Sequence, residues 1–251
     1  MDWVPAVLGS SGMIKGVYVG AFVLATLLTI GSLTRIRQVQ DPDTRRGLAA
    51  LLVGSGAWAA SNVGFLLAPG VTLAVVFHTI GLVVGLSTVG AWLYFASAYT
   101  GRSIHRNKTL RQLALAAFLV VIVFKITNPV HGLYYSVSVV SVPFEYVAVQ
   151  NGVIHWTVMG GSYALSAIGY FMLFERFGAV SLDTRPLMAL VGLMGLPILL
   201  DIAGFTSTVL IDIIYEPLGV AVFASGFFFV FLEQFQSVRL AGERAEPVVV
   251  L

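Results

Sequence analysis

Six polar side chains interrupt stretches of this sequence that are otherwise apolar, and they are the first candidates for chemistry. They are Asn62, His78, Lys125, His155, Asp201 and Glu216. Asp201 and one of the histidines could perform acid and base chemistry if the two side chains meet. The sequence has no His-x-x-x-His spacing and no Gly-x-Ser-x-Gly motif, so it predicts neither a metal centre nor a serine nucleophile. We therefore expect ligand binding without a metal or cofactor, and we do not expect an enzyme.

Four of these residues also have a simple structural interpretation. His78 and His155 lie near the ends of apolar stretches, where water can solvate an imidazole. Lys125 can extend its ammonium group toward lipid headgroups. Asn62 can hydrogen-bond a neighbouring helix. These interpretations stand beside the functional ones.

The two carboxyl groups differ in how much explanation they need. Glu216 precedes Pro217, so it can mark a helix start, where the helix dipole favours a negative charge. Asp201 follows Pro197 by about one turn, and this proline is expected to interrupt its helix. A carboxyl group at that depth needs a partner, water or a proton. Asp201 is therefore expected to be the electrostatic centre of a polar cavity.

The composition shows which elements must position these side chains. The chain has 251 residues, of which 58% are hydrophobic and only 10% are charged, and its mean hydropathy is +0.92. Ordinary globular domains carry about 25% charged residues, so most of this surface must face lipid. The pI near 9.0 consequently predicts no nucleic-acid partner. The absence of cysteine excludes disulfides and thiolate chemistry.

The expected fold is an all-α integral membrane protein, a seven-transmembrane helix bundle. A helix needs roughly 20 apolar residues to span the bilayer core. The spans predicted on this basis are residues 13–33, 48–67, 73–99, 110–127, 153–174, 186–206 and 212–235. The last of them is expected to run as one uninterrupted helix from Glu216 to Gln236.

The distribution of basic residues predicts the orientation. All of the 14 Lys and Arg residues except Lys15 and Lys125 fall on one side of the predicted spans. Because cytoplasmic loops carry the excess of Lys and Arg, the N-terminus is expected outside and the C-terminus in the cytoplasm of a multi-pass plasma-membrane protein. All six polar candidates then fall in the outer half of the bilayer, which suggests a polar cavity there.

One connection, residues 128–152, is much longer than the others. It begins with "TNPVHG", in which Pro129 disfavours helix at Asn128. The following stretch alternates, is rich in Val and Tyr, and contains the turn signals "PFEY" and "QNG". This pattern predicts a short extracellular β-hairpin between the fourth and fifth spans, lying over the outer end of the bundle. His131 is expected to hydrogen-bond the turn, and both His131 and Asn128 are candidate ligand-binding residues.

Two familiar seven-helix classes do not fit. A retinal pigment needs a Lys in its last helix for the Schiff base, and "IIYEPLGVAVFASGFFFVFLEQF" has none. The chain also lacks the acidic-Arg-Tyr and Asn-Pro-x-x-Tyr motifs of G-protein-coupled receptors.

Four stretches stand out together: "AWLYFASAYTGR", "TNPVHGLYY", "GVIHW" followed by "YALSAIGYFMLF", and "DIIYEPLGVAVFASG". In this order, over about residues 10–235, they resemble the N-terminal seven-transmembrane sensor region of archaeal and bacterial histidine kinases. Thr127, Asn128, His131 and Gly132 are the most specific part of the resemblance.

The resemblance implies a membrane sensory domain over residues 1–236 that responds to an unknown small-molecule or lipid ligand and relays the signal through its last helix. Residues 237–251 would be a cytoplasmic linker that leads into a PAS domain. Members of the family act as dimers, so the resemblance also implies a homodimer. The alternative is a small-molecule carrier or a membrane enzyme that uses Asp201 and a nearby histidine. We find neither the paired interrupted segments of a carrier nor an enzyme motif.

Overall fold

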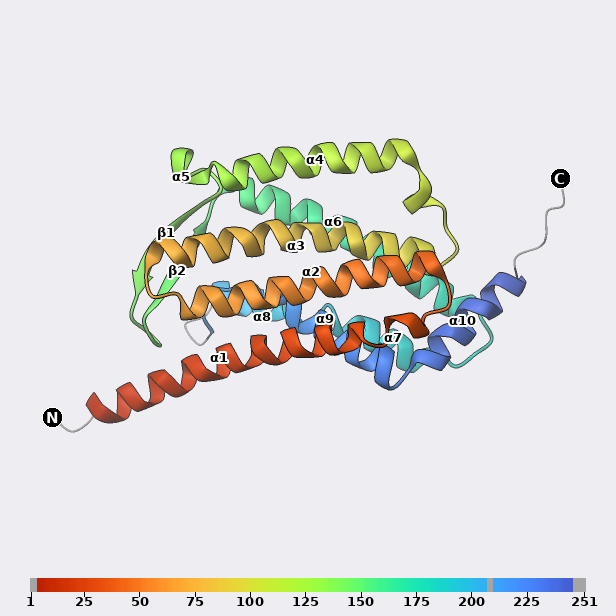
Figure 1. Ribbon diagram of the computed structural model, residues 1–251, viewed down its shortest axis with the longest axis horizontal. Coiled ribbons are helices and arrows are strands. Elements are labelled where there is room, and N and C mark those ends of the chain that lie inside the picture. Colours follow the sequence, from red (N-terminus) through yellow and green to blue (C-terminus); the bar gives the residue numbers. More distant parts are fainter. Residues whose placement is uncertain (1–3, 207–209, 246–251) are drawn as a thin grey trace.

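The computed structural model describes residues 4–206 and 210–245, and nearly all of its elements are helices (Figure 1). The long helices are α1 (Val4–Leu33), α2 (Pro42–Leu67), α3 (Val71–Tyr99), α4 (Lys108–Ile126) and α6 (Val153–Gly178). The shorter ones are α5 (Asn128–His131), α7 (Arg185–Leu193), α8 (Pro197–Thr206), α9 (Glu216–Phe229) and α10 (Leu232–Ala245). Two 3₁₀ helices are η1 (Ile36–Gln38) and η2 (Ile104–Arg106), and the strands are β1 (Tyr135–Val140) and β2 (Tyr146–Asn151).

Local sequence signals account for where the helices start. Asp41 caps α2 by accepting a hydrogen bond from the Thr44 backbone N–H at 2.6 Å, and Pro42 occupies the first turn. Asn107 caps α4 in the same way, with its side-chain oxygen 3.1 Å from the Leu110 backbone nitrogen. Such caps satisfy N–H groups that have no partner within the helix. Both helices therefore begin at positions that the sequence specifies.

Six helical stretches of the described residues are long and apolar enough to cross a membrane. Helices α7 and α8 count as one of these stretches, because together they give the apolar run Arg185–Gly204. Turn residues 194–196 interrupt the helix directly before Pro197, the proline at which the sequence allows a kink. Helices α9 and α10 make a seventh span if the pair is taken as one crossing.

The prediction of an uninterrupted helix from Glu216 to Gln236 is wrong. Helices α9 and α10 meet at an angle of 81°. Helix α10 is amphipathic: Phe235 and Val238 are 0% and 1% exposed, whereas Glu233 faces solvent. Burying that apolar face against the end of the bundle requires the chain to turn, so α10 lies across the end instead of continuing α9.

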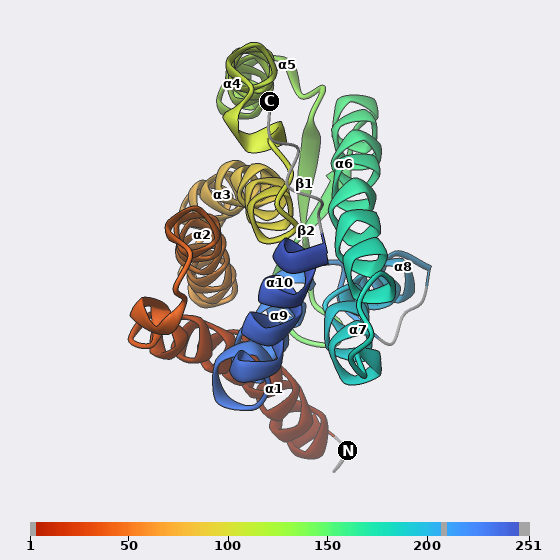
Figure 2. The same ribbon diagram turned by 90° about the vertical axis from the view of Figure 1, so that its right-hand side faces the viewer.

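The arrangement of the helices places α9 in the middle of the bundle (Figure 2). It packs against α1, α2, α7 and α8. Helices α2 and α3 approach closely, because a Cβ atom on Gly47 would lie 2.7 Å from the backbone of Phe95. Helix α4 stands apart, and Lys125 is its only buried residue.

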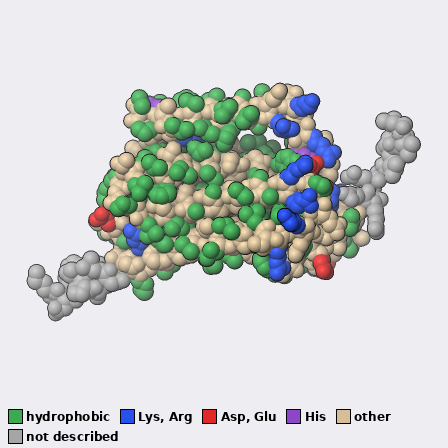
Figure 3. Space-filling model, in the orientation of Figure 1, with side chains coloured by type: hydrophobic (Ala, Val, Ile, Leu, Met, Phe, Trp, Pro, Cys, Tyr) green, Lys and Arg blue, Asp and Glu red, His purple; other side chains and the backbone are tan. Residues whose placement is uncertain are grey.

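A two-stranded antiparallel hairpin is present, as predicted, and its register runs from Tyr135 opposite Asn151 to Val140 opposite Tyr146. It lies at one end of the bundle, which we call the hairpin end (Figure 1). Tyr134 and Phe144 are buried there at 1% and 4% exposure. The opposite end gathers Lys and Arg side chains, and we call it the basic end (Figure 3).

Candidate functional site

The turn that follows α4 is built by two of the predicted site residues. The Asn128 side chain accepts hydrogen bonds from the backbone N–H groups of Tyr134 and Tyr135 at 2.9 and 3.2 Å, and it donates one to the Tyr135 carbonyl at 2.8 Å. His131 Nδ1 accepts from the Leu133 backbone N–H at 2.9 Å. Gly132 closes the turn at φ +63°, a conformation that favours glycine. Both polar side chains therefore hold the backbone that leads into the hairpin.

A cavity of about 140 Å³ lies inside the bundle toward the hairpin end. Its walls come mainly from α3 and α6, and aromatic side chains supply much of them. These are Trp58, Trp92, Tyr134, Tyr163 and Tyr170. Lys125, His155 and Glu216, three of the predicted site residues, also line it.

Lys125 and His155 both lie close to the ring of Tyr134. The Lys125 ammonium is 5.4 Å from the centre of the Tyr134 ring, and the His155 ring is 5.5 Å from it. Lys125 is 3% exposed and donates a hydrogen bond to the Leu82 carbonyl of α3, so it turns inward and does not extend to the headgroups. Burial raises the pKa of the Tyr134 phenol, which therefore stays protonated and can donate a hydrogen bond.

Three hydrogen bonds hold the start of α9, and a predicted site residue takes part in each of them. Asn62 of α2 donates to the Ile214 carbonyl at 3.0 Å. Asp201 of α8 accepts from the Tyr215 backbone N–H at 2.8 Å. These bonds attach α2 and α8 to the two residues before α9.

The third bond involves Glu216, the first residue of α9. Its carboxyl group accepts a hydrogen bond from the Tyr163 hydroxyl of α6 at 2.9 Å. The carboxyl groups of Glu216 and Asp201 also lie beside each other. Asp201 Oδ2 and Glu216 Oε2 have no hydrogen-bond partner among the described residues. In the described chain Asp201 therefore contacts Tyr215 and Glu216, and neither of the histidines that the sequence offered as its acid or base partner.

His78, the last of the predicted site histidines, lines a second, smaller cavity of about 20 Å³. His78 lines it together with Asn62 and Asp212, and its ring lies edge-on to Tyr135 of the hairpin at 4.9 Å. Burial raises the pKa of the Asp212 carboxyl group. The eight predicted site residues are therefore divided between the larger cavity, this smaller cavity, the turn and the start of α9.

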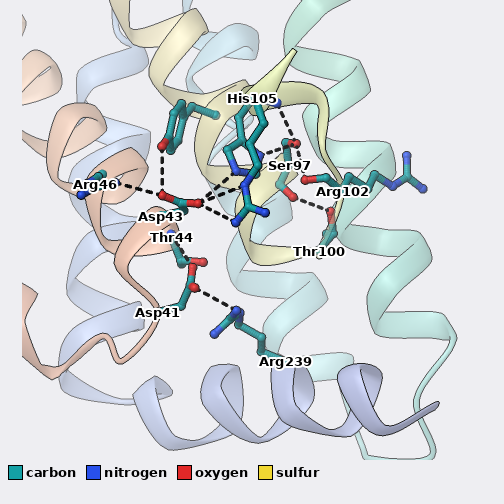
Figure 4. A network of polar contacts seen from close by, with 11 residues as sticks. Asp41, Asp43, Thr44, Arg46, Ser97, Thr100, Arg102, His105 and Arg239 are labelled. Carbon is teal, nitrogen blue, oxygen red and sulfur yellow. Dashed lines mark hydrogen bonds and ion pairs between the residues drawn. The ribbon is translucent and has the colours of Figure 1, made fainter. Parts of the chain in front are cut away.

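The basic end carries a polar network that the sequence interpretation did not single out (Figure 4). Asp43 accepts hydrogen bonds from Arg106 of η2 at 2.8 and 3.3 Å and contacts His105 at 3.4 Å. Asp41 forms an ion pair with Arg239 of α10 at 3.0 Å. The motif "QDPDT", in which two carboxylates flank a proline at a helix start, could have indicated this network in the sequence.

Two further contacts attach α10 to the basic end. The Tyr99 hydroxyl donates to the Phe235 carbonyl at 2.8 Å, and the Gln236 side chain donates to the Gln38 carbonyl at 2.8 Å. The Phe235 ring packs between aromatic side chains of the bundle, with its centre 4.5 Å from that of Phe227. Helix α10 is therefore attached to the connection between α1 and α2, to α3 and to α9.

The comparison with protein families identifies the chain. The profile described as the N-terminal 7TM region of histidine kinase matches residues 17–236. The chain belongs to this family, which confirms the resemblance found in the sequence. It is a membrane sensory region of the histidine kinase class, and its apolar helices are those of a multi-pass membrane protein. No match was found among curated proteins.

Proposed function

We propose that this region detects a stimulus at the hairpin end and relays it through α9 and α10 to a cytoplasmic kinase. The observation that carries the proposal is the convergence of three hydrogen bonds on residues 214–216. They come from Asn62, Asp201 and Tyr163, which belong to three different helices. A change in the cavity that displaces any of these helices would therefore act on the start of α9.

The far end of α9 offers a route for the signal. Helix α10 follows α9 after the bend and is attached to the basic end by the Asp41–Arg239 ion pair and the Tyr99 hydrogen bond. A displacement of α9 would strain these contacts and change the position of α10 relative to the basic end. In this proposal the N-terminus lies outside, the basic end is cytoplasmic and the hairpin covers the outer end, in accord with the positive-inside rule.

The proposed unit is a homodimer in the bilayer, with residues beyond α10 leading toward output domains. A ligand acts in this scheme only through a difference in its affinity for two arrangements of the bundle. The carrier or enzyme alternative gains no support, because Asp201 contacts Tyr215 and Glu216 and meets neither His78 nor His155 among the described contacts.

The test fuses the chain to the cytoplasmic part of a sensor kinase and measures autophosphorylation in membranes. Tyr163→Phe removes the hydroxyl that binds Glu216 and leaves the ring in place. Coupling between sites is typically worth about 1–3 kcal/mol, so basal output should change by about 5- to 150-fold.

Tyr170→Phe is the matched control, because Tyr170 lies on the same helix and lines the same cavity, but its hydroxyl makes no hydrogen bond to a described residue. It should leave basal output within about twofold, which is small beside the expected coupling. Equal output for both variants and the unmodified fusion, at matched protein levels, would refute the relay.

A further inference from the structure

Lys125 carries a buried amino group that has no carboxylate partner among the described residues. It is 3% exposed, and its partners in the described chain are the Leu82 carbonyl and the Tyr134 ring. No carboxylate within residues 4–206 and 210–245 forms an ion pair with it. Removing an ammonium group from water is costly unless an anion compensates for the lost hydration. The environment of Lys125 therefore favours the arrival of a negative group.

The carboxyl group that shares the cavity does not fill this role. Glu216 accepts a hydrogen bond from Tyr163 and lies beside Asp201 at the start of α9. Beside Lys125, in contrast, the Tyr134 phenol is protonated and His155 is 4% exposed with no partner for its Nδ1 atom in the described chain. One side of the cavity thus gathers an ammonium group, a phenol and an imidazole.

The rest of the cavity limits the size and polarity of what can bind there. Its volume of about 140 Å³ is close to that of cavities that hold one benzene-sized group. The lining away from Lys125 is largely apolar and includes Val89, Trp92, Met194 and Val220. Pockets of this kind bind mainly through apolar contact, and a few polar groups fix the orientation.

We propose that the cavity binds a small apolar monocarboxylic acid, with its carboxylate at Lys125, Tyr134 and His155 and its hydrocarbon body along the Trp92 wall. The proposal rests on the sensory function proposed above and names the class of ligand for it. An aliphatic or aryl acid with about six to eight carbon atoms matches a benzene-sized space. The surface is hollowed beneath α4 (Figure 3), and entry from that side is part of the proposal.

The test measures binding to the full chain in lipid nanodiscs by calorimetry and by tryptophan fluorescence, since Trp58 and Trp92 line the cavity. The probes are hexanoate, hexanol and hexylamine, which share one hydrocarbon body and differ in charge. Hexanoate should bind at least about tenfold more tightly than hexanol, and hexylamine should bind least, because Lys125 repels it. Equal or tighter binding of hexylamine would overturn the proposal and assign recognition to Glu216.

Variants separate the role of Lys125 from general effects of charge. Lys125→Met should abolish the preference for hexanoate over hexanol while hexanol binding persists. Lys15→Met is the matched control: Lys15 is near the hairpin residue Phe144, at 6.0 Å from its ring, and does not line the cavity, so the preference should remain. Lys125→Arg keeps the charge and should keep the preference if Lys125→Met fails to fold. A preference that survives Lys125→Met in folded protein contradicts the proposal.

Two further outcomes distinguish the source of the ligand and the fate of the sensory function. Palmitate added to the bilayer should not compete with hexanoate; binding of palmitate alone would overturn the small-acid assignment. If none of the probes binds but Tyr163→Phe still changes kinase output, the ligand class is wrong and the sensory function stands. If hexanoate binds yet neither it nor Tyr163→Phe changes output, the ligand class stands and the sensory function is wrong.

Discussion

Replacing Phe235 by Ala should weaken the attachment of α10 to the basic end while the membrane helices stay in place. The Phe235 ring is 0% exposed and lies 4.5 Å from Phe227, 5.7 Å from Tyr99 and 5.9 Å from Phe177 between ring centres. Replacing a buried Phe by Ala typically costs about 3–5 kcal/mol. The Asp41–Arg239 pair remains, but its side chains are partly exposed, at 18% and 20%, so it compensates little.

The lost stabilisation lowers the free energy needed to open α10 locally, because the other helices keep their own contacts. About 3 kcal/mol corresponds to roughly a hundredfold change in an opening equilibrium. Amide hydrogen exchange within residues 232–245 should therefore accelerate by about that factor in nanodiscs, while exchange in α2 and α3 stays unchanged. Leu240→Ala, on the same helix but 43% exposed, should change exchange by less than about threefold. Unchanged exchange in α10 of the Phe235→Ala protein would refute this account of the bend.

Three other predictions follow from the fold and the site. Cysteines introduced at Ser103 and Ser138 should be labelled from opposite sides of sealed cells, and labelling of both from outside would contradict the proposed orientation. His131→Ala removes the acceptor for the Leu133 backbone N–H, so hydrogen exchange should accelerate in the hairpin while the spans stay protected; unchanged protection there would exclude this role. Asp201→Asn keeps an acceptor for the Tyr215 backbone N–H, so the protein should fold. Kinase output in the fusion should nevertheless change by about 5- to 150-fold, which corresponds to about 1–3 kcal/mol of coupling. Output equal to that of the unmodified fusion would show that Asp201 has only a structural role.

Hydropathy was sufficient to locate the long spans, because an apolar run of span length has few alternatives to a helix in a membrane. It failed at the last span for a physical reason. The stretch "GFFFVFLEQF" is apolar enough to continue a helix, and only the burial of Phe235 against Tyr99 and Phe227 shows where the chain must turn. The local hydrophobic periodicity of a segment does not predict tertiary packing of this kind.

The candidate site shows a similar division. Depth along a helix can be counted from the sequence, so Lys125 and His155 were expected at the same end of the bundle, as the structure shows. The direction in which each side chain points depends on how neighbouring helices pack. Lys125 could have extended toward headgroups, yet it turns to the Leu82 carbonyl, and Asp201 meets Glu216 in place of a histidine.

The chain breaks on both sides of α9 give the proposed relay a mechanical basis. Helix α9 has 14 residues, preceded by the non-helical residues 210–215 and followed by the bend before α10. A short helix with an interruption at each end can shift as a rigid body, because the φ and ψ changes are absorbed in a few residues outside it. Its first turn is bonded by Tyr163, whereas its other end leads to the buried ring of Phe235. In the proposed relay, a ligand-dependent shift at the first turn of α9 would therefore change the packing of Phe235 at its other end. The Phe235→Ala replacement tests this last step.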